Sequence, residues 1–310
     1  PLTRPWDKQA TADSGKCLPT TSLLHEQINY LAAMDIFFIA LLFVGGIAFF
    51  LYFLFGVTFY LIEPVFLRIA GRPFYVHFYI RQRALSLAER SHLSQVAFYR
   101  KLSPKRRKYF EHRVARFLKR YRFHGKGGLI ITDEMRILVA ASYVSLTFGF
   151  RNFIISAFRD ILLYPDEYPS TLSGDIHRGE FNPRAKVVVF SWNHFREGLV
   201  HESDNLNLGI HEFAHALHFH GMQRSDTAAA NFAVWYRRIM EEIHHPPNAK
   251  RLIESDYFRI YAYTNRYEFL AVILEHFFET PQQFRQEFPE LYGHVRHMIN
   301  LDAAAVRYQA

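Results

Sequence analysis

The chain has 310 residues, of which 50% are hydrophobic and 17% aromatic, and this composition excludes a disordered or low-complexity protein. The length allows one large domain or two smaller ones. A single cysteine, Cys17, excludes an intramolecular disulfide framework and a cysteine-based zinc ribbon. The net charge of +8 is compatible with nucleic acid, an acidic partner or an anionic membrane surface.

The first long feature is an apolar run near the N-terminus. Residues 36–62 contain no Asp, Glu, Lys, Arg or His, and as a helix they would be about 40 Å long against a hydrocarbon core of about 30 Å. This run is too long for the apolar region of a signal peptide, and its N-terminal flank is not basic. A buried core helix is the alternative, but the length and the absence of charge predict one transmembrane helix.

The two flanks of this run differ strongly in charge. Residues 1–35 carry three basic and four acidic side chains, whereas residues 64–128 carry 17 Lys or Arg and two acids, a net of +15. The positive-inside rule then places the C-terminal part in the cytoplasm and makes the protein a single-pass protein of the inner membrane. The basic cluster at 105–108 is compatible with nucleic-acid binding, but a solvated helix face near the membrane is the preferred interpretation.

Helical patterns dominate the rest of the chain. Ser103 followed by Pro104 predicts the start of an amphipathic helix, and Thr132 followed by two acids predicts the cap of a second one. Two β-rich runs, 161–164 and 186–192, come next, and mainly helical sequence follows from about residue 208. These patterns predict an α+β domain in which helices dominate.

The motif with the clearest chemistry is His-Glu-Phe-Ala-His at 211–215, an H-E-x-x-H pattern. On a helix, positions four apart share a face, so His211 and His215 can reach one metal ion. Glu212 lies close enough to act as a general base, since zinc lowers the pKa of a water ligand to about 7. Two satisfied core histidines are the structural alternative, but the apolar surroundings favour a metal site.

A catalytic zinc site usually has a third protein ligand. His218 lies seven residues after His211, but a third ligand on the same helix would be strained, so we expect a neighbouring or surface histidine there. A later apolar stretch, 267–278, carries Glu268 and Glu275, which share one helix face. Either carboxylate needs a charge or a donor to be buried, and both are candidates.

The chain resembles the Mlc titration factor A family of zinc metallopeptidases. The resemblance covers roughly residues 103–295 and rests on several blocks: His124–Leu129, Ile131–Arg136, Leu163–Pro165, Val188–Trp192, His211–Leu217, Tyr261–Ala262, Glu268–Val272, Glu275, Phe277–Phe278 and Pro281.

This resemblance implies a zincin-like domain with one Zn²⁺ per chain, bound by His211, His215 and Glu268. It also implies that Glu212 is the catalytic base and that Tyr261, seven residues before Glu268, stabilises the oxyanion or protonates the leaving amine. Glu275 would orient a ligating histidine. In such peptidases an edge strand before the metal helix pairs with extended substrate, and residues 186–192 are the candidate.

The first hypothesis is a membrane-anchored, cytoplasm-facing zinc peptidase that cleaves peptides or exposed protein termini, with aminopeptidase activity as one form. The alternative is a tethered module that sequesters a cytoplasmic regulator such as a transcriptional repressor, and Glu212 favours the peptidase. An intramembrane protease is rejected because residues 201–207, just before the motif, are polar. We expect four parts: an N-terminal extracytoplasmic segment 1–35, a transmembrane helix 36–62 that contacts the bilayer, a basic juxtamembrane helical linker 63–102 and a zinc metallopeptidase domain 103–310.

Overall fold

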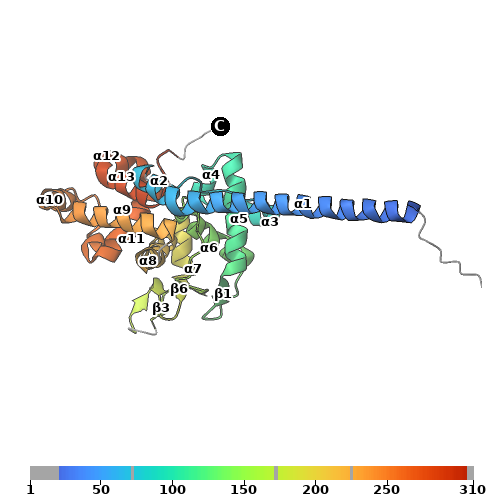
Figure 1. The fold of residues 1–310 in the computed structure, drawn as a ribbon. Helices are drawn as coiled ribbons and strands as arrows, with labels where there is room; N and C mark the ends of the chain where they lie inside the picture. The colour runs from blue at the N-terminus through green and yellow to red at the C-terminus, as the bar shows by residue number, and fades with distance from the viewer. Residues whose placement is uncertain (1–20, 71–72, 171–173, 224–225, 306–310) are drawn as a thin grey trace, which may run out of the picture. The chain divides into compact units, whose positions relative to one another are not determined.

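The computed structural model describes residues 21–70, 73–170, 174–223 and 226–305. The chain divides into two compact units, Pro1–Ile62 and Glu63–Ala310. Most of the expected N-terminal segment, residues 1–20, lies outside the described residues. Figure 1 shows both units with their helices and strands labelled.

The first unit consists of helix α1 (Thr21–Val57) and the π-helical turn η1 (Thr58–Ile62). The segment His25–Val57 is long and apolar enough to cross a membrane, and it has no buried side chains. The helix begins 15 residues before the expected boundary at residue 36. Because no Pro or Gly lies between Thr21 and that boundary, nothing in the sequence stops the helix there. The charge-free run marks the apolar part of the helix and not its ends.

The second unit is an α+β fold in which helices dominate, as predicted. Its helices are α2 (Glu63–Ala70), α3 (Leu87–Leu93), α4 (Ala97–Arg100), α5 (Pro104–Arg120), α6 (Asp133–Leu146), α7 (Trp192–Val200), α8 (Leu208–Gln223), α9 (Thr227–His244), α10 (Pro246–Glu254), the 3-10 turn η2 (Ile260–Tyr263), α11 (Arg266–Glu279), α12 (Pro281–Glu287) and α13 (Pro289–Met298). Its strands are β1 (Arg122–Gly125), β2 (Asp160–Tyr164), β3 (Tyr168–Pro169), β4 (Ile176–His177), β5 (Gly179–Asn182) and β6 (Val187–Ser191). The helices α5 and α6 start where the sequence predicted, and Thr132 accepts a hydrogen bond from the backbone N–H of Met135.

The segment 63–102 is not only a linker. Its C-terminal part, residues 85–102, packs into the same hydrophobic core as the rest of the unit through six buried side chains: Leu85, Leu93, Val96, Phe98, Tyr99 and Leu102. Helix α3 starts with a capping box in which Ser86 and Glu89 bond each other's backbone N–H groups. In the sequence, the many basic residues of this segment obscured its apolar pattern. Basic side chains face solvent here, while the apolar side chains between them face the core.

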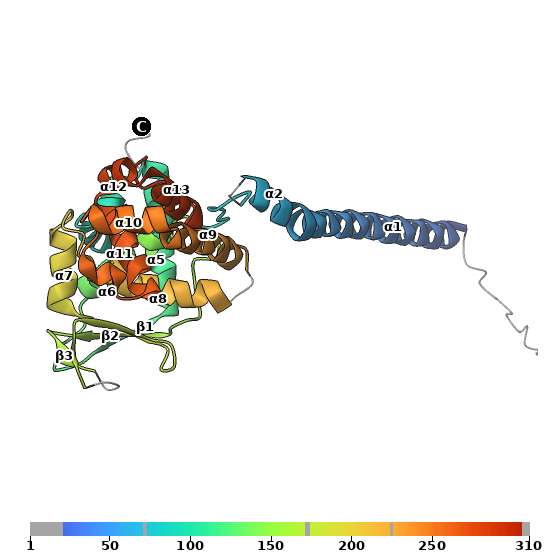
Figure 2. The same cartoon turned by 90° about the vertical axis from the view of Figure 1, so that its left-hand side faces the viewer.

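The main sheet has the strand order β1-β2-β6-β5. The first three strands are parallel, and β5 pairs antiparallel with β6. Figure 2 shows the helices gathered on one side of this sheet. The sequence prediction that 186–192 forms the edge strand is therefore wrong, because β6 has a neighbour on both sides. The edge strands are β1 and β5, and β5 is the one that packs against α8.

The core beneath α8 is aromatic. Phe213, which is fully buried, contacts the rings of Tyr143, Phe158 and Phe190 at centroid distances of 5.1, 5.6 and 5.3 Å. Large aromatic side chains supply much of the burial free energy of such a core. Because Phe213 lies between the two histidines of the motif, this anchor fixes the rotation of α8 and turns the histidines away from the core.

Candidate metal centre

Two helices supply the candidate ligands, and each is capped by an asparagine. The Oδ1 atom of Asn207 accepts a hydrogen bond from the N–H of Ile210 at the start of α8, at 3.0 Å. The Oδ1 atom of Asn265 accepts from the N–H groups of Tyr267 and Glu268 at 2.9 and 3.1 Å. These caps satisfy otherwise free N–H groups and set where each helix begins. Glu268 therefore lies in the first turn of α11.

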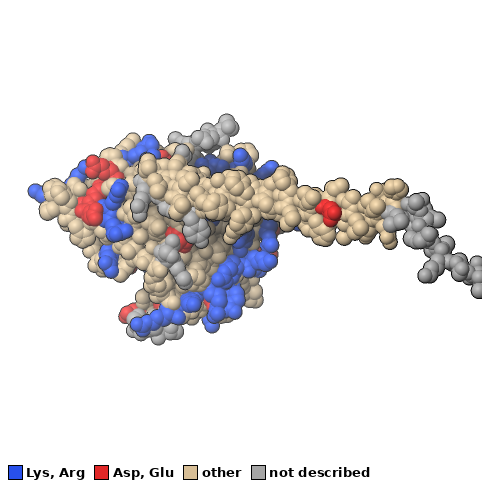
Figure 3. Space-filling model, viewed as in Figure 1, with Lys and Arg blue, Asp and Glu red and all other residues tan. Residues whose placement is uncertain are grey.

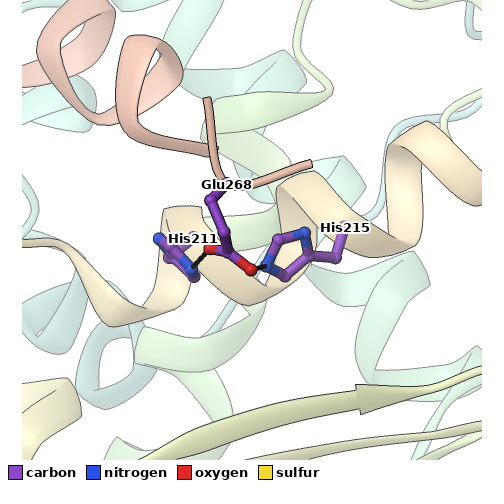
Figure 4. A group of neighbouring side chains, drawn as sticks. All are labelled: His211, His215 and Glu268. Atoms are coloured by element: carbon purple, nitrogen blue, oxygen red, sulfur yellow. Dashed lines mark ion pairs between the residues drawn. The ribbon is translucent and has the colours of Figure 1, made fainter. Parts of the chain in front are cut away.

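The structure brings His211, His215 and Glu268 together, and these three residues are called the metal group below. Figure 4 shows the Glu268 carboxylate between the two imidazoles. Its Oε2 lies 3.0 Å from Nε2 of His211, and its Oε1 lies 3.6 Å from Nε2 of His215. One ligand atom from each residue can be chosen so that all three lie within 4.8 Å of one another.

This arrangement fits a metal ion. Ligands about 2.0–2.1 Å from a tetrahedral zinc are roughly 3.3 Å apart, which is close to both nitrogen–oxygen distances in the group. Oε2 of Glu268 is buried and makes no hydrogen bond to any described residue, because its approach to His211 lacks hydrogen-bond geometry. A buried carboxylate oxygen without a donor is costly, and a metal ion would remove that cost. Two imidazoles and one carboxylate also form a donor set that catalytic zinc uses.

Glu275, the other candidate carboxylate, lies behind His211. It is 2% exposed, and its Oε1 lies 3.5 Å from Nδ1 of His211. Arg259 donates to its Oε2 at 2.6 Å, and the N–H of Asn207 donates to its Oε1 at 3.1 Å. These partners satisfy the oxygens of the buried carboxylate with hydrogen bonds. A carboxylate on Nδ1 leaves Nε2 of His211 free to face the metal position.

The pKa values of the two histidines shift in opposite directions. Burial disfavours the charged form of His211, but the nearby carboxylates of Glu268 and Glu275 outweigh it and raise its pKa to about 10. Burial and the nearby charge of His211 lower the pKa of His215 to about 4. The carboxylates of Glu268 and Glu275 therefore favour the protonated, positively charged form of His211. A bound metal cation would supply the same positive charge at this place.

Glu212 lies against the edge strand. It is 6% exposed, and burial raises its pKa to about 7. A Cβ atom added at Gly179 of β5 would lie 2.6 Å from its Oε1 and 2.7 Å from its Cγ. Only glycine leaves room for the Glu212 side chain at this position.

Tyr261 lies on η2 near the ligands. Its ring centroid is 6.0 Å from that of His211, and the residue is 49% exposed. Partial burial and the neighbouring Glu268 carboxylate raise the pKa of Tyr261, so its phenol stays protonated at neutral pH. A protonated phenol can donate a hydrogen bond to a substrate oxygen.

His218 is not a surface residue. It is 8% exposed and meets the rings of Tyr236 and Tyr267 edge-on at 4.6 and 5.0 Å. Burial lowers its pKa to about 4, so the imidazole is neutral. Its place on α8, seven residues after His211, puts it beside the metal group and outside it.

Two cavities flank the metal group. The larger, about 780 Å³, is lined by His211, Glu212 and Tyr261. The smaller, about 490 Å³, is lined by His215 and Glu268. The edge strand borders both cavities: its start at Gly179 and the preceding residues 176–178 line the larger, and Phe181 and Pro183 line the smaller. An extended chain along β5 would therefore cross the metal group on its way from one cavity to the other.

Sequence reasoning missed three residues of this site. Gly179 lies in a strand too short and too polar to show alternation, and Arg259 reaches Glu275 from a loop sixteen residues earlier. The capping role of Asn265 could have been predicted, because Asn directly before a helix that carries an acid in its first turn is a capping signal. None of the other contacts follows from local spacing, since each joins segments far apart in the sequence.

Comparison with known proteins places the chain in a family. The sequence model described as glucose-regulated metallo-peptidase M90 matches residues 77–299. An uncharacterized protein of Synechocystis is 28% identical over 232 residues, which cover 67% of this chain and 81% of the relative.

Two further relatives are both named Mlc titration factor A. The protein of Serratia proteamaculans is 22% identical over 197 residues, covering 57% of this chain and 73% of its own. That of Yersinia pestis is 23% identical over 209 residues, covering 62% and 76%. The match begins at residue 77, before the expected start at 103, in agreement with the packing of 85–102 into the core. The chain belongs to the glucose-regulated metallo-peptidase M90 family.

Proposed function

We propose that this chain is a membrane-anchored zinc peptidase that hydrolyses peptide bonds. One observation carries the proposal: His211, His215 and Glu268 converge at distances that fit a tetrahedral metal ion, and Glu212 lies beside them. The family is described as a metallo-peptidase family, which supports the same chemistry. Zinc is the proposed metal because the donor set of two imidazoles and one carboxylate is typical of it.

Each residue of the site has a step in this reaction. When bound, zinc would polarise the peptide carbonyl and lower the pKa of a water ligand. Glu212 accepts the proton of the attacking water and delivers it to the leaving amine. Tyr261 donates a hydrogen bond to the substrate oxygen as negative charge develops there. Glu275, held by Arg259, keeps His211 in the tautomer that presents Nε2.

The edge strand β5 is the proposed binding site for the substrate backbone. Among the described residues no strand pairs with its second edge. An extended peptide can add to such an edge through main-chain hydrogen bonds, which are independent of sequence. The cavities on either side of the metal group would then receive the side chains next to the cleaved bond.

The membrane anchor is the apolar helix α1. We propose that it spans the inner membrane, with residues 64–310 in the cytoplasm, because the flank after it carries a net charge of +15. Figure 3 shows Lys and Arg gathered over α5 and β1 in the second unit. The exposed basic residues of α5 are Lys105, Lys108, Arg116, Lys119 and Arg120. A basic face of this kind is attracted to anionic lipid.

A second function is supported by the names of the relatives. Two of them are titration factors, and this name describes a protein that binds and removes another. The alternative is therefore a module that sequesters a cytoplasmic regulator at the membrane, with hydrolysis absent or secondary.

Replacing Glu212 by Gln distinguishes the two functions. The amide preserves the shape of the side chain but cannot accept a proton, so peptide hydrolysis by the purified full chain should disappear while metal content and melting temperature stay the same. The assay is a peptide-library digest read by mass spectrometry. If Glu212→Gln cleaves peptides at the wild-type rate, Glu212 is not the base. If neither form cleaves any peptide and both bind one protein partner equally, the sequestering function is correct.

A further inference from the structure

The smaller cavity beside the metal group has aromatic walls. It lies between the end of β5 and the helices α8, α9 and α11, and its apolar lining includes Phe181, Phe219, Met222, Tyr236 and Tyr267. Its volume of about 490 Å³ is ample for one large side chain. Because His215 and Glu268 also line it, whatever occupies this cavity lies directly beside the proposed metal position.

Two residues that line this cavity each carry a buried polar atom that has no partner. Nε2 of His218 and the phenol oxygen of Tyr236 are buried and make no hydrogen bond to any described residue. The two residues are only 8% and 4% exposed, and both line the cavity. Other buried side chains of the described residues also carry an unpaired polar atom, but these two lie on rings 4.6 Å apart that line one cavity, so a single group entering the cavity could pair with both.

The exposed ring of Tyr267 packs against one of these two residues. Tyr267 meets His218 edge-on at 5.0 Å and is 41% exposed. Arg266 donates to the phenol oxygen of Tyr267 at 2.9 Å and is itself exposed. A substrate side chain that displaces this ring would reach both atoms. The fixed positive charge of Arg266 at the rim disfavours Lys or Arg in the same place.

From these contacts we infer that the cavity selects tyrosine at one of the two residues that flank the cleaved bond. A phenol ring fits the aromatic walls, and its hydroxyl both donates to and accepts from His218 and Tyr236. Phenylalanine would fill the walls but leave the two polar atoms unpaired, and alanine would leave the cavity empty. The inference rests on the proposed peptidase function for the direction of the substrate but not for binding itself.

The test uses binding and cleavage in parallel. The probes are fluorescent octapeptides of one sequence, in which Tyr, Phe, Ala or Lys is placed at each position in turn. Binding is measured by fluorescence anisotropy on the full chain with Glu212→Gln, and cleavage is measured on the wild type. At one position we expect Tyr to bind about tenfold more tightly than Phe, the effect of one hydrogen bond to a polar group. Ala and Lys should bind at least about a hundredfold more weakly than Tyr.

Two variants locate the preference in this cavity. Tyr236→Phe removes one hydroxyl and should bring the ratio between Tyr and Phe down to about two. Met222→Trp, at a lining residue that is 45% exposed, should fill the cavity and weaken both aromatic peptides about tenfold while sparing Ala. The control is Tyr257→Phe, which removes a buried hydroxyl outside the cavity and should change neither ratio.

The outcomes separate this inference from the proposed function. Equal binding of all side chains at every position overturns the inference, and so does a tyrosine preference that survives Met222→Trp unchanged. Cleavage without an aromatic preference also overturns it while the peptidase function stands. A tyrosine preference in binding without cleavage by the wild type supports the cavity and refutes hydrolysis. If no peptide of the panel binds or is cleaved, both are refuted.

Discussion

Gly179 offers a sharp test of how the edge strand positions the proposed base. In Gly179→Ala the new Cβ would lie 2.6, 2.7 and 2.8 Å from Oε1, Cγ and Cδ of Glu212. Carbon contacts are favourable only from about 3.5 Å, so the Glu212 side chain has to move by about 0.8 Å. The backbone of β5 accepts alanine without strain, because the φ angle of Gly179 is outside the positive range. The change therefore acts on one side chain.

A displacement of this size is large for a reacting group. A misplacement of about 1 Å typically costs about 10² in rate, so we expect kcat of Gly179→Ala to fall about a hundredfold. Metal content should stay at the wild-type value, because the three proposed ligands lie on α8 and α11. The melting temperature should change little, since alanine is favoured over glycine within a strand by about 0.5–1 kcal/mol, which offsets the crowding.

The matched control is Gly293→Ala in α13. A Cβ there meets nothing within 4 Å, so activity should be unchanged and stability should rise by up to about 1 kcal/mol. The assay compares kcat on the best library peptide, zinc per chain and melting temperature for the full chain in detergent. If Gly179→Ala keeps kcat within twofold of the wild type while folded and metal-loaded, the contact between β5 and Glu212 does not position the base.

Three further predictions concern the phenol, an acidic anchor and the membrane topology. Tyr261→Phe should lower kcat by about 10²–10³ with little change in KM, because its hydroxyl acts only as charge develops; an unchanged kcat in steady-state assays would exclude this role. Asp160→Asn should lose about 1 kcal/mol of stability at pH 7, since hydrogen bonds from Arg122 hold the pKa of the buried Asp160 well below its usual range. Because its pKa is lowered in the folded state, Asp160 contributes stability above about pH 3.9, and this stability is lost as the pH falls. The urea midpoints of the wild type and Asp160→Asn should therefore converge in acid. A difference between the midpoints that stays constant with pH would refute this prediction. Protease added to sealed spheroplasts should leave residues 64–310 intact, and their digestion from outside would reverse the orientation.

The local features of this fold and site could be predicted from the sequence. The helix starts at Pro104 and Asp133 follow from capping chemistry, and the shared face of His211 and His215 follows from helical periodicity. The charge-free run identified the apolar helix but missed its start, because hydropathy reports what lipid accepts and not where hydrogen bonding stops. These successes all depend on neighbours within about one turn.

The rest depended on tertiary packing. Glu268 and Glu275 share one helix face in sequence, and only the placement of α11 against α8 sets Glu268 at the two Nε2 atoms and Glu275 at Nδ1 of His211. The edge of the sheet was assigned to residues 186–192, which have the stronger β pattern. Strand order depends on pairing across the sheet, and the short polar strand β5 carries no periodic signal of its own.

The central claim is that His211, His215 and Glu268 together hold one zinc ion. Elemental analysis of the purified full chain tests it most directly, with Glu268→Ala and Glu275→Ala measured beside the wild type. We expect one zinc per chain in the wild type, a loss of most metal in Glu268→Ala, and a smaller loss, of about 10–100-fold in affinity, in Glu275→Ala. Full metal retention in Glu268→Ala together with complete loss in Glu275→Ala would move the third ligand to Glu275 and contradict this account.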